Sequence, residues 1–263
     1  MKLERLTRGE SSPSSSTAAT TTPSKAVIKV TTLPSKGLPY PKGWEVFYSP
    51  YTYGDVMWVS QSELGEKELV DFVMSGIECK GFDRYDLTVF DFQYLSVLRQ
   101  VSSFGDASFY LCTECPQCKR EVKRLLSIKD IVYKDLPAPS LPVVAMVGGV
   151  ELEFTPLTVS DYLKAVEAGK GKDLVYLMSL QVRNMNPEEA YSLISSATGE
   201  DLLRLKMVED YLDHGMEPVT VICRGCGYRT NVLLGRDRYF FRPKDLGSES
   251  VTSGIRFGKA RSG

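Results

Sequence analysis

Apolar residues recur at helical spacing in two stretches of the first half of the chain, Glu66–Ile77 and Thr88–Phe104. Three further helices are predicted in the second half, at Asp173–Arg183, Pro187–Ser196 and Gly199–Asp213. The helix at Pro187 has the clearest start signal, because asparagine precedes the proline as an N-cap and acidic residues follow in the first turn.

Short apolar or alternating runs predict strands between these helices. A glycine pair, Gly148-Gly149, interrupts the run Val143–Phe154 and predicts a hairpin with a tight turn. The other predicted strands are Val27–Thr31, Glu45–Tyr48, Val219–Cys223 and Thr230–Leu234. Between the first two strands, Leu33–Gly43 contains three prolines and two glycines and is predicted to be rigid and extended or turning.

An ordered series of matches relates the second half of the chain to the first. The pattern P-x-T-x-x-D begins at Pro50 and again at Pro156, and a C-x-x-C pair begins at Cys115 and again at Cys223. The offsets are 156 − 50 = 106 and 223 − 115 = 108 residues. A T-x-x-D match alone is a common helix opening, but the constant order favours two copies of one unit. In this unit a strand is followed by a P-x-T-x-x-D turn, helices and a cysteine hairpin, and the helix start at Thr88–Asp91 corresponds to Thr198–Asp201. The predicted fold is therefore α+β, with two pseudo-repeated halves (strand, helices and C-x-x-C β-hairpin).

Composition divides the chain into four segments. Residues 1–25 form a Ser/Thr-rich leader that is expected to be disordered, because it has too little apolar surface to bury. Residues 26–140 and 141–246 are the two predicted halves, with one cysteine pair each. Residues 247–263 form a Gly/Ser-rich tail that is expected to be flexible.

The overall charge argues against a protein whose main task is to coat nucleic acid. The chain has 32 Lys and Arg against 33 Asp and Glu, a formal net charge of −1. The apolar run near Leu141–Val150 is too short to span a membrane, and no apolar signal-peptide core follows Met1, so we expect a protein made in the cytosol. The single histidine, His214, excludes mechanisms that need several imidazoles, and no catalytic residues are predicted.

Two cysteine pairs have the spacing of metal-binding knuckles. Cys115 and Cys118, like Cys223 and Cys226, are separated by two residues between strand-forming stretches. Two such turns complete a tetrahedral four-thiolate shell with Zn–S distances near 2.3 Å. We therefore predict one structural zinc per chain in a zinc-ribbon-like site that joins the two halves. The alternative is a set of four buried free thiols.

Two other cysteines need separate interpretation. Cys112 could replace Cys115, because Cys112 and Cys115 also form a C-x-x-C pair, but Pro116 and the repeat favour Cys115. Cys79 has no neighbouring cysteine in the sequence and is interpreted as a core residue.

Two rival functions follow from a zinc site. A zinc deaminase needs an H-x-E motif with a proline before the C-x-x-C pair, and His214-Gly215-Met216 does not supply it. A zinc-ribbon nucleic-acid-binding protein is the stronger rival, because basic residues flank both knuckles and aromatics are interleaved with them after the second. Arginine with aromatics is equally typical of a protein interface, which the balanced charge favours.

One proline-rich stretch is distinctive. The residues Leu33-Pro34-Ser35-Lys36-Gly37-Leu38-Pro39-Tyr40-Pro41 fit an L-P-S-[KR]-G-x-x-Y-P opening. In this respect the chain resembles the tail baseplate hub and hub-assembly proteins of T-even-type contractile-tailed bacteriophages. The resemblance continues through Leu87–Asp91 and both knuckles to Phe240-Phe241-Arg242-Pro243, and it covers Val27 to Pro243.

The resemblance implies a structural or assembly role in the tail baseplate of a virion. It implies other phage tail or baseplate proteins as partners, with a homo-oligomer left open, and neither a membrane nor nucleic acid. We predict partner contacts in the rigid opening segment and the aromatic end, because such surfaces lose little entropy on docking. The predicted contact residues are Leu33, Pro34, Lys36, Gly37, Tyr40, Pro41, Tyr239, Phe240 and Phe241. The alternative for both segments is packing within the chain.

Overall fold

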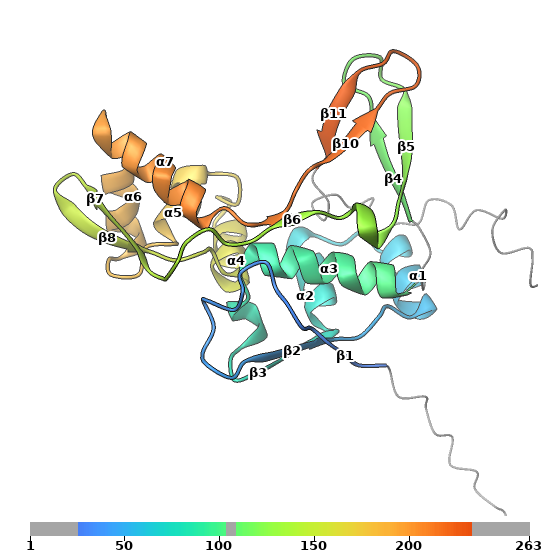
Figure 1. The fold of residues 1–263 in the computed structure, drawn as a ribbon, viewed down its shortest axis with the longest axis horizontal. Coiled ribbons are helices and arrows are strands. Elements are labelled where there is room, and N and C mark those ends of the chain that lie inside the picture. Colours follow the sequence, from blue (N-terminus) through green and yellow to red (C-terminus); the bar gives the residue numbers. More distant parts are fainter. Residues whose placement is uncertain (1–25, 104–108, 233–263) are drawn as a thin grey trace, which may run out of the picture.

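The computed structural model describes residues 26–103 and 109–232 (Figure 1). Within these ranges the chain forms seven α-helices and small antiparallel sheets, which confirms the mixed α+β class. The helices are α1 (Tyr53–Gln61), α2 (Glu66–Met74), α3 (Val89–Ser103), α4 (Val159–Glu167), α5 (Leu174–Ser179), α6 (Pro187–Ser195) and α7 (Glu200–Leu212). Two short 3₁₀ turns, η1 and η2, cover Arg84–Asp86 and Ile128–Asp130.

The strands form one three-stranded sheet and four two-stranded pairs among the described residues. The three-stranded sheet has the order β1 (Ile28–Lys29), β2 (Glu45–Tyr48), β3 (Ile77–Lys80). The pairs are β4 (Phe109–Glu114) with β5 (Glu121–Leu126), β6 (Tyr133–Lys134) with β9 (Gly215–Met216), β7 (Val143–Val147) with β8 (Val150–Phe154), and β10 (Val219–Ile222) with β11 (Arg229–Val232). The predicted glycine-turn hairpin is confirmed, since Gly148 and Gly149 join β7 to β8 with φ angles of 57° and 79°.

Two helices lie where the sequence predicted only turns. Both α1 and α4 begin at the threonine of a P-x-T-x-x-D pattern. The Thr52 hydroxyl accepts the Asp55 amide, and the Thr158 hydroxyl accepts the Asp161 amide, so each threonine caps a helix of nine residues. The pattern is therefore a helix start in both places.

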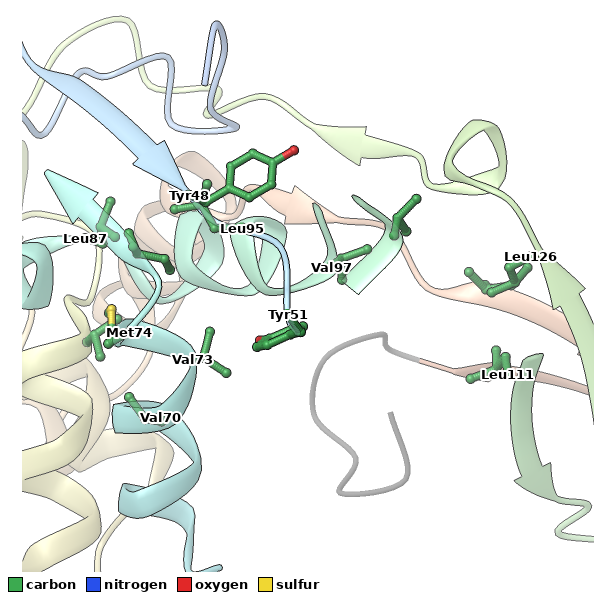
Figure 2. Packing of buried hydrophobic residues seen from close by; sticks show 14 of the residues in the cluster. Tyr48, Tyr51, Val70, Val73, Met74, Leu87, Leu95, Val97, Leu111 and Leu126 are labelled. Carbon is green, nitrogen blue, oxygen red and sulfur yellow. The ribbon is translucent and has the colours of Figure 1, made fainter. Parts of the chain in front are cut away.

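Buried apolar side chains form two clusters. The larger cluster contains Met74 of α2 and Leu95 of α3, and it reaches Leu111 and Leu126 of the β4–β5 hairpin (Figure 2). It also takes in Val159 of α4 and residues of β10, so segments from beyond residue 140 pack into it. The smaller cluster lies among β7, β8, α6 and α7.

One short motif occurs twice in the chain, and its two copies contact each other. Leu87-Thr88-Val89-Phe90-Asp91 starts α3, and Leu157-Thr158-Val159-Ser160-Asp161 starts α4. Thr88 and Thr158 form an antiparallel bridge, in which the Val89 amide donates to the Leu157 carbonyl (2.9 Å) and the Val159 amide donates to the Leu87 carbonyl (2.8 Å). We call this contact the T-V-x-D junction. Its reciprocal hydrogen bonds relate the starts of α3 and α4 by a local two-fold axis.

The longer repeat predicted from the sequence stays a prediction. A strand, a threonine-capped helix and a cysteine hairpin recur in the same order in the two halves. However, β2 lies in the centre of a three-stranded sheet, whereas β8 pairs only with β7 as a strand. The T-V-x-D junction brings together Thr88 and Thr158, which the predicted alignment did not match to each other.

Candidate metal centre

The four cysteines of the two predicted knuckles lie at the tips of two neighbouring hairpins. Cys115 and Cys118 are in the turn between β4 and β5, and Cys223 and Cys226 are in the turn between β10 and β11. Figure 1 shows these hairpins side by side, and β10 contacts β5. The two hairpin tips are 223 − 118 = 105 residues apart in the sequence.

The two turns have the same backbone geometry. In the first, the Cys115 amide donates to the Arg120 carbonyl (2.8 Å) and the Lys119 amide donates to the Cys115 carbonyl (2.9 Å). In the second, the Cys223 amide donates to the Tyr228 carbonyl and the Gly227 amide donates to the Cys223 carbonyl, both at 2.8 Å. The fourth residue after each first cysteine has a positive φ angle, 61° at Lys119 and 75° at Gly227. Each turn thus directs its two thiols to the same side.

The four sulfur atoms form one group. Cys115 Sγ lies 3.6 Å from Cys226 Sγ, and Cys118 Sγ lies 3.5 Å from Cys223 Sγ. All four sulfurs are within 4.8 Å of one another, and none forms a disulfide. A tetrahedral metal with bonds of about 2.3 Å separates its thiolates by about 3.8 Å. The four residues therefore fit one tetrahedral metal ion, which their thiolates could hold.

The backbone favours the thiolate form of two of the four cysteines. The amides of Gly225 and then Cys226 hydrogen-bond to the Cys223 sulfur and lower the pKa of this thiol to about 6. The Cys118 amide lowers the pKa of Cys115 in the same way. At Cys226 the Tyr228 amide lowers the pKa, but burial and hydrogen bonds to the other three thiols outweigh it and raise this pKa to about 12. Four protein ligands complete a tetrahedral shell and leave no position for water, so such a site supports structure rather than hydrolysis.

Two arginine side chains also connect the two hairpins. An Arg124 guanidinium nitrogen donates to the Thr220 carbonyl. Arg120 covers Gly225 so closely that a Cβ atom there would lie 2.8 Å from its guanidinium. Further from the tips, Leu111 and Leu126 of the first hairpin and Val219 and Val221 of the second are buried in the larger cluster.

The two remaining cysteines are not members of the described sulfur group. The backbone of Cys112 pairs with Lys123 in the β4–β5 ladder, but its side chain is outside the described part, so its role as a substitute ligand stays open. Cys79 lies in β3, where burial raises the pKa of its thiol to about 12 and leaves it unreactive at neutral pH.

The predicted partner-binding residues are only partly on the surface. Leu33, Pro34, Gly37 and Tyr40 are buried within the chain. Lys36 and Pro41 are exposed, and the Lys36 ammonium lies 3.2 Å from the Asp135 carboxylate. The buried residues therefore pack within the chain, whereas a partner role for the exposed ones stays a prediction. The predictions at Tyr239, Phe240 and Phe241 fall outside the described residues.

A buried polar network, not predicted from the sequence, holds this proline-rich segment in place. The Asp91 carboxylate is fully buried and accepts hydrogen bonds from the Ser35 amide (2.9 Å) and the Tyr40 hydroxyl. The same hydroxyl accepts the Thr88 amide (3.0 Å), so it lies between the N-cap residue of α3 and the carboxylate. Burial, and then the neighbouring Asp91 charge, raise the pKa of Tyr40 well above its usual value and keep the phenol protonated.

The only histidine completes this network. His214 is buried, its Nδ1 donates to the Leu212 carbonyl (2.6 Å), and its Nε2 lies 3.2 Å from the Thr88 hydroxyl. Because Nδ1 carries the proton, Nε2 accepts from this hydroxyl. Burial lowers the pKa of His214, which favours the neutral imidazole. The T-x-x-D spacing signalled the helix cap at Thr88, but no local pattern pointed to Ser35, Tyr40 or His214.

Comparison of the chain with protein-family models, with curated proteins and with solved structures gives no match. Among the described helices, none has the length and apolar content needed to cross a membrane.

Proposed function

We propose that this protein is a structural or assembly component of the baseplate hub of a contractile bacteriophage tail, and that a zinc ion on its four clustered cysteines serves folding only. One observation carries the metal part of this proposal: thiols from two hairpins, 105 residues apart (223 − 118), converge within 4.8 Å. The baseplate part is supported by the resemblance between Val27 and Pro243, which includes the L-P-S-K-G segment and both knuckles.

The physical role of the metal follows from the small size of the hairpins. A two-stranded hairpin alone is marginally stable in water, and here Cys118 is half-buried and Cys226 is exposed at the tips. Metal binding to thiolates contributes directly to folding free energy when the unfolded chain has no preformed site. One zinc per chain would therefore fix β4–β5 against β10–β11. A tetrahedral set of four sulfurs also suits iron, so elemental analysis of the purified protein is the direct check.

The proposal includes descent of the two halves from one unit. The shared order of strand, capped helix and cysteine hairpin supports it, as do the matching hydrogen bonds and positive φ angles of the two cysteine turns. In such a protein each half contributes one pair of ligands, and the metal fixes how the halves sit against each other.

Identification of the proteins that co-purify with this chain from infected cells tests the hub assignment. An affinity-tagged chain, expressed from the phage genome, should co-purify with a defined set of tail proteins. A tagged unrelated phage protein of similar size, purified in parallel, removes non-specific binders. Recovery of polymerase or chromosomal DNA instead of tail proteins would overturn the proposal.

A nucleic-acid-binding role is the second candidate, because the hairpins carry unpaired basic side chains. Arg120, Arg224 and Arg229 are exposed, and none of them forms an ion pair with a described acidic residue. Exposed Tyr228 lies beside them in the sequence and could stack on a base. A gel-shift experiment with random single- and double-stranded DNA at moderate salt should show no shift at micromolar protein. Tight, salt-sensitive binding would favour this second candidate.

A further inference from the structure

The local two-fold axis at the T-V-x-D junction relates two polar positions with different surroundings. On one side are the Thr88 amide and the Asp91 carboxylate, which we call the first half-site. On the other side are the Thr158 amide and the Asp161 carboxylate, which we call the second half-site. Each pair combines the amide of a helix N-cap residue with the third residue of the helix.

The first half-site holds a segment of the chain itself. The Tyr40 hydroxyl accepts from the Thr88 amide and donates to Asp91, while the Ser35 amide donates to the same carboxylate. The occupant is thus a proline-rich segment of successive tight turns, in which the Lys36 amide donates to the Leu33 carbonyl and the Tyr40 amide donates to the Gly37 carbonyl, and it presents a tyrosine hydroxyl. Its ring stacks on Phe82, with 4.5 Å between the ring centroids.

The second half-site faces a cleft of about 610 Å³. The Thr158 amide has no hydrogen-bond acceptor in the described part of the chain. The Asp161 carboxylate is 8% exposed and already bonds the Thr158 hydroxyl (2.9 Å), the Arg183 guanidinium (3.0 Å) and the Lys164 ammonium (3.0 Å). Within the described residues the amide is therefore the group of this half-site that is available to a ligand, and it corresponds to the Thr88 amide that donates to Tyr40.

The cleft wall matches the chemistry of a proline-rich segment. Four prolines, Pro39, Pro41, Pro142 and Pro156, line it together with Tyr40 and Phe82. Aromatic side chains line the grooves that bind proline-containing peptides, and a proline-rich segment is rigid and loses little conformational entropy on docking. The ionisable side chains of the lining that are charged at neutral pH are two acids, Asp86 and Asp161, and two bases, Lys164 and Arg183, so the cleft suits an occupant with little net charge.

We propose that this cleft binds a turn-forming segment of a partner protein that contains proline and tyrosine, with the tyrosine hydroxyl accepting a hydrogen bond from the Thr158 amide. The chain's own Leu33–Pro41 segment on the first half-site is the precedent for this chemistry. The proposal goes beyond the hub assignment and does not depend on it, because the cleft contains none of the four clustered cysteines.

The experiment uses the intact chain and a dye-labelled peptide, Leu-Pro-Ser-Lys-Gly-Leu-Pro-Tyr-Pro, which copies residues 33–41. Fluorescence anisotropy should show saturable binding. The same peptide with phenylalanine in place of tyrosine should bind about fivefold more weakly, which is the effect of one neutral hydrogen bond. Absence of saturable binding, or equal affinity of the two peptides, would overturn the proposal.

A matched pair of variants places the peptide in the cleft. Ser160→Trp puts a large ring on the cleft wall and should weaken binding at least about tenfold, as expected when a bulky group fills a binding site. Ser192→Trp makes the same change on an exposed position of α6 outside the cleft and should leave the affinity unchanged. Equal affinities of the two variants would contradict the proposed location.

A crosslinking measurement keeps the test decisive if Ser160→Trp fails to fold. The peptide then carries a photoreactive benzoyl-phenylalanine at the tyrosine position, and the unsubstituted chain is used. Crosslinks at Thr155–Lys164 or Arg183 support the proposal. Crosslinks at Thr88–Asp91 would show that the peptide displaces the chain's own segment, and they would overturn it.

Discussion

The cysteine hairpins and the T-V-x-D junction both join distant parts of the chain, but by different means. At the hairpins, four thiols within 4.8 Å of one another lie at the tips, and the strands behind them contribute Leu111, Leu126 and Val221 to the larger apolar cluster. At the junction, buried Asp91 receives hydrogen bonds from Ser35 and Tyr40, and the surrounding core is continuous. We propose that a bound metal ion stabilises the hairpin tips, whereas hydrogen bonds and packing within the chain stabilise the junction. Substitutions at the hairpin cysteines should destabilise only the two hairpins. Substitutions at the T-V-x-D junction should lower the unfolding free energy of the whole chain.

Loss of one cysteine ligand should have the largest effect. Cys115→Ser should remove the metal and unfold both hairpin tips, because structural zinc sites contribute on the order of 10 kcal/mol of apparent binding energy. Hydrogen exchange should become fast in β4–β5 and β10–β11 while α3 stays protected. Cys79→Ser, at the half-buried cysteine of β3, is the control and should keep one metal per chain. Equal metal content in both variants would contradict the assignment.

Removal of the buried carboxylate should have the next largest effect. Asp91→Ala leaves the Ser35 amide and the Tyr40 hydroxyl without their acceptor, and we expect a loss of about 3 kcal/mol in unfolding free energy. Asp161→Ala is the matched change on the other side of the junction. It should cost about 1 kcal/mol, because the Arg183 and Lys164 partners are partly exposed to water. Urea denaturation of both variants measures the difference, and equal losses would show that the two sides are equivalent.

The tyrosine hydroxyl should contribute less than the carboxylate. Tyr40→Phe keeps the ring on Phe82 but removes the group between the Thr88 amide and Asp91, at an expected cost of about 1.5 kcal/mol. In the Asp91→Ala background the same substitution should cost clearly less, because one partner is already gone. A double-mutant cycle by urea denaturation tests this coupling, and strict additivity would be evidence against the described network.

The smallest effect should be a pH dependence from His214. Burial lowers the pKa of this imidazole in the folded chain below its unfolded value of about 6.5. The unfolded chain then binds more protons, so the stability present above about pH 6.5 should decline as the pH falls toward the folded-state pKa. His214→Gln should flatten the stability profile between about pH 7.5 and 5.5 relative to the unsubstituted chain. Metal release at low pH affects both proteins, so the difference between them isolates the histidine; parallel profiles would refute the effect.

The two regions also differ in how far the sequence predicts them. The four clustered cysteines could be identified from the sequence because each C-x-x-C turn is a local pattern that places two thiols on one side of its hairpin. The junction could not, because Ser35, Tyr40 and His214 reach Thr88 and Asp91 only through the tertiary fold. Proline content predicts that a segment is rigid, but it does not predict which side is buried.

The helices α1 and α4, which were not predicted, can be explained in the same way. The P-x-T-x-x-D pattern was interpreted as a turn, but the threonine hydroxyl and the aspartate amide bond each other and start α1 and α4. The motif Leu87–Asp91 was visible in the sequence, and so was its second copy at Leu157–Asp161. Their contact could not be predicted, because an antiparallel bridge between single residues has no periodic pattern.

X-ray absorption at the zinc edge tests the central claim most directly. The intact chain would be purified without added metal and measured in solution. The account predicts one zinc per chain with four sulfur neighbours at about 2.3 Å. A protein without zinc, or a zinc shell with nitrogen or oxygen ligands, would contradict it.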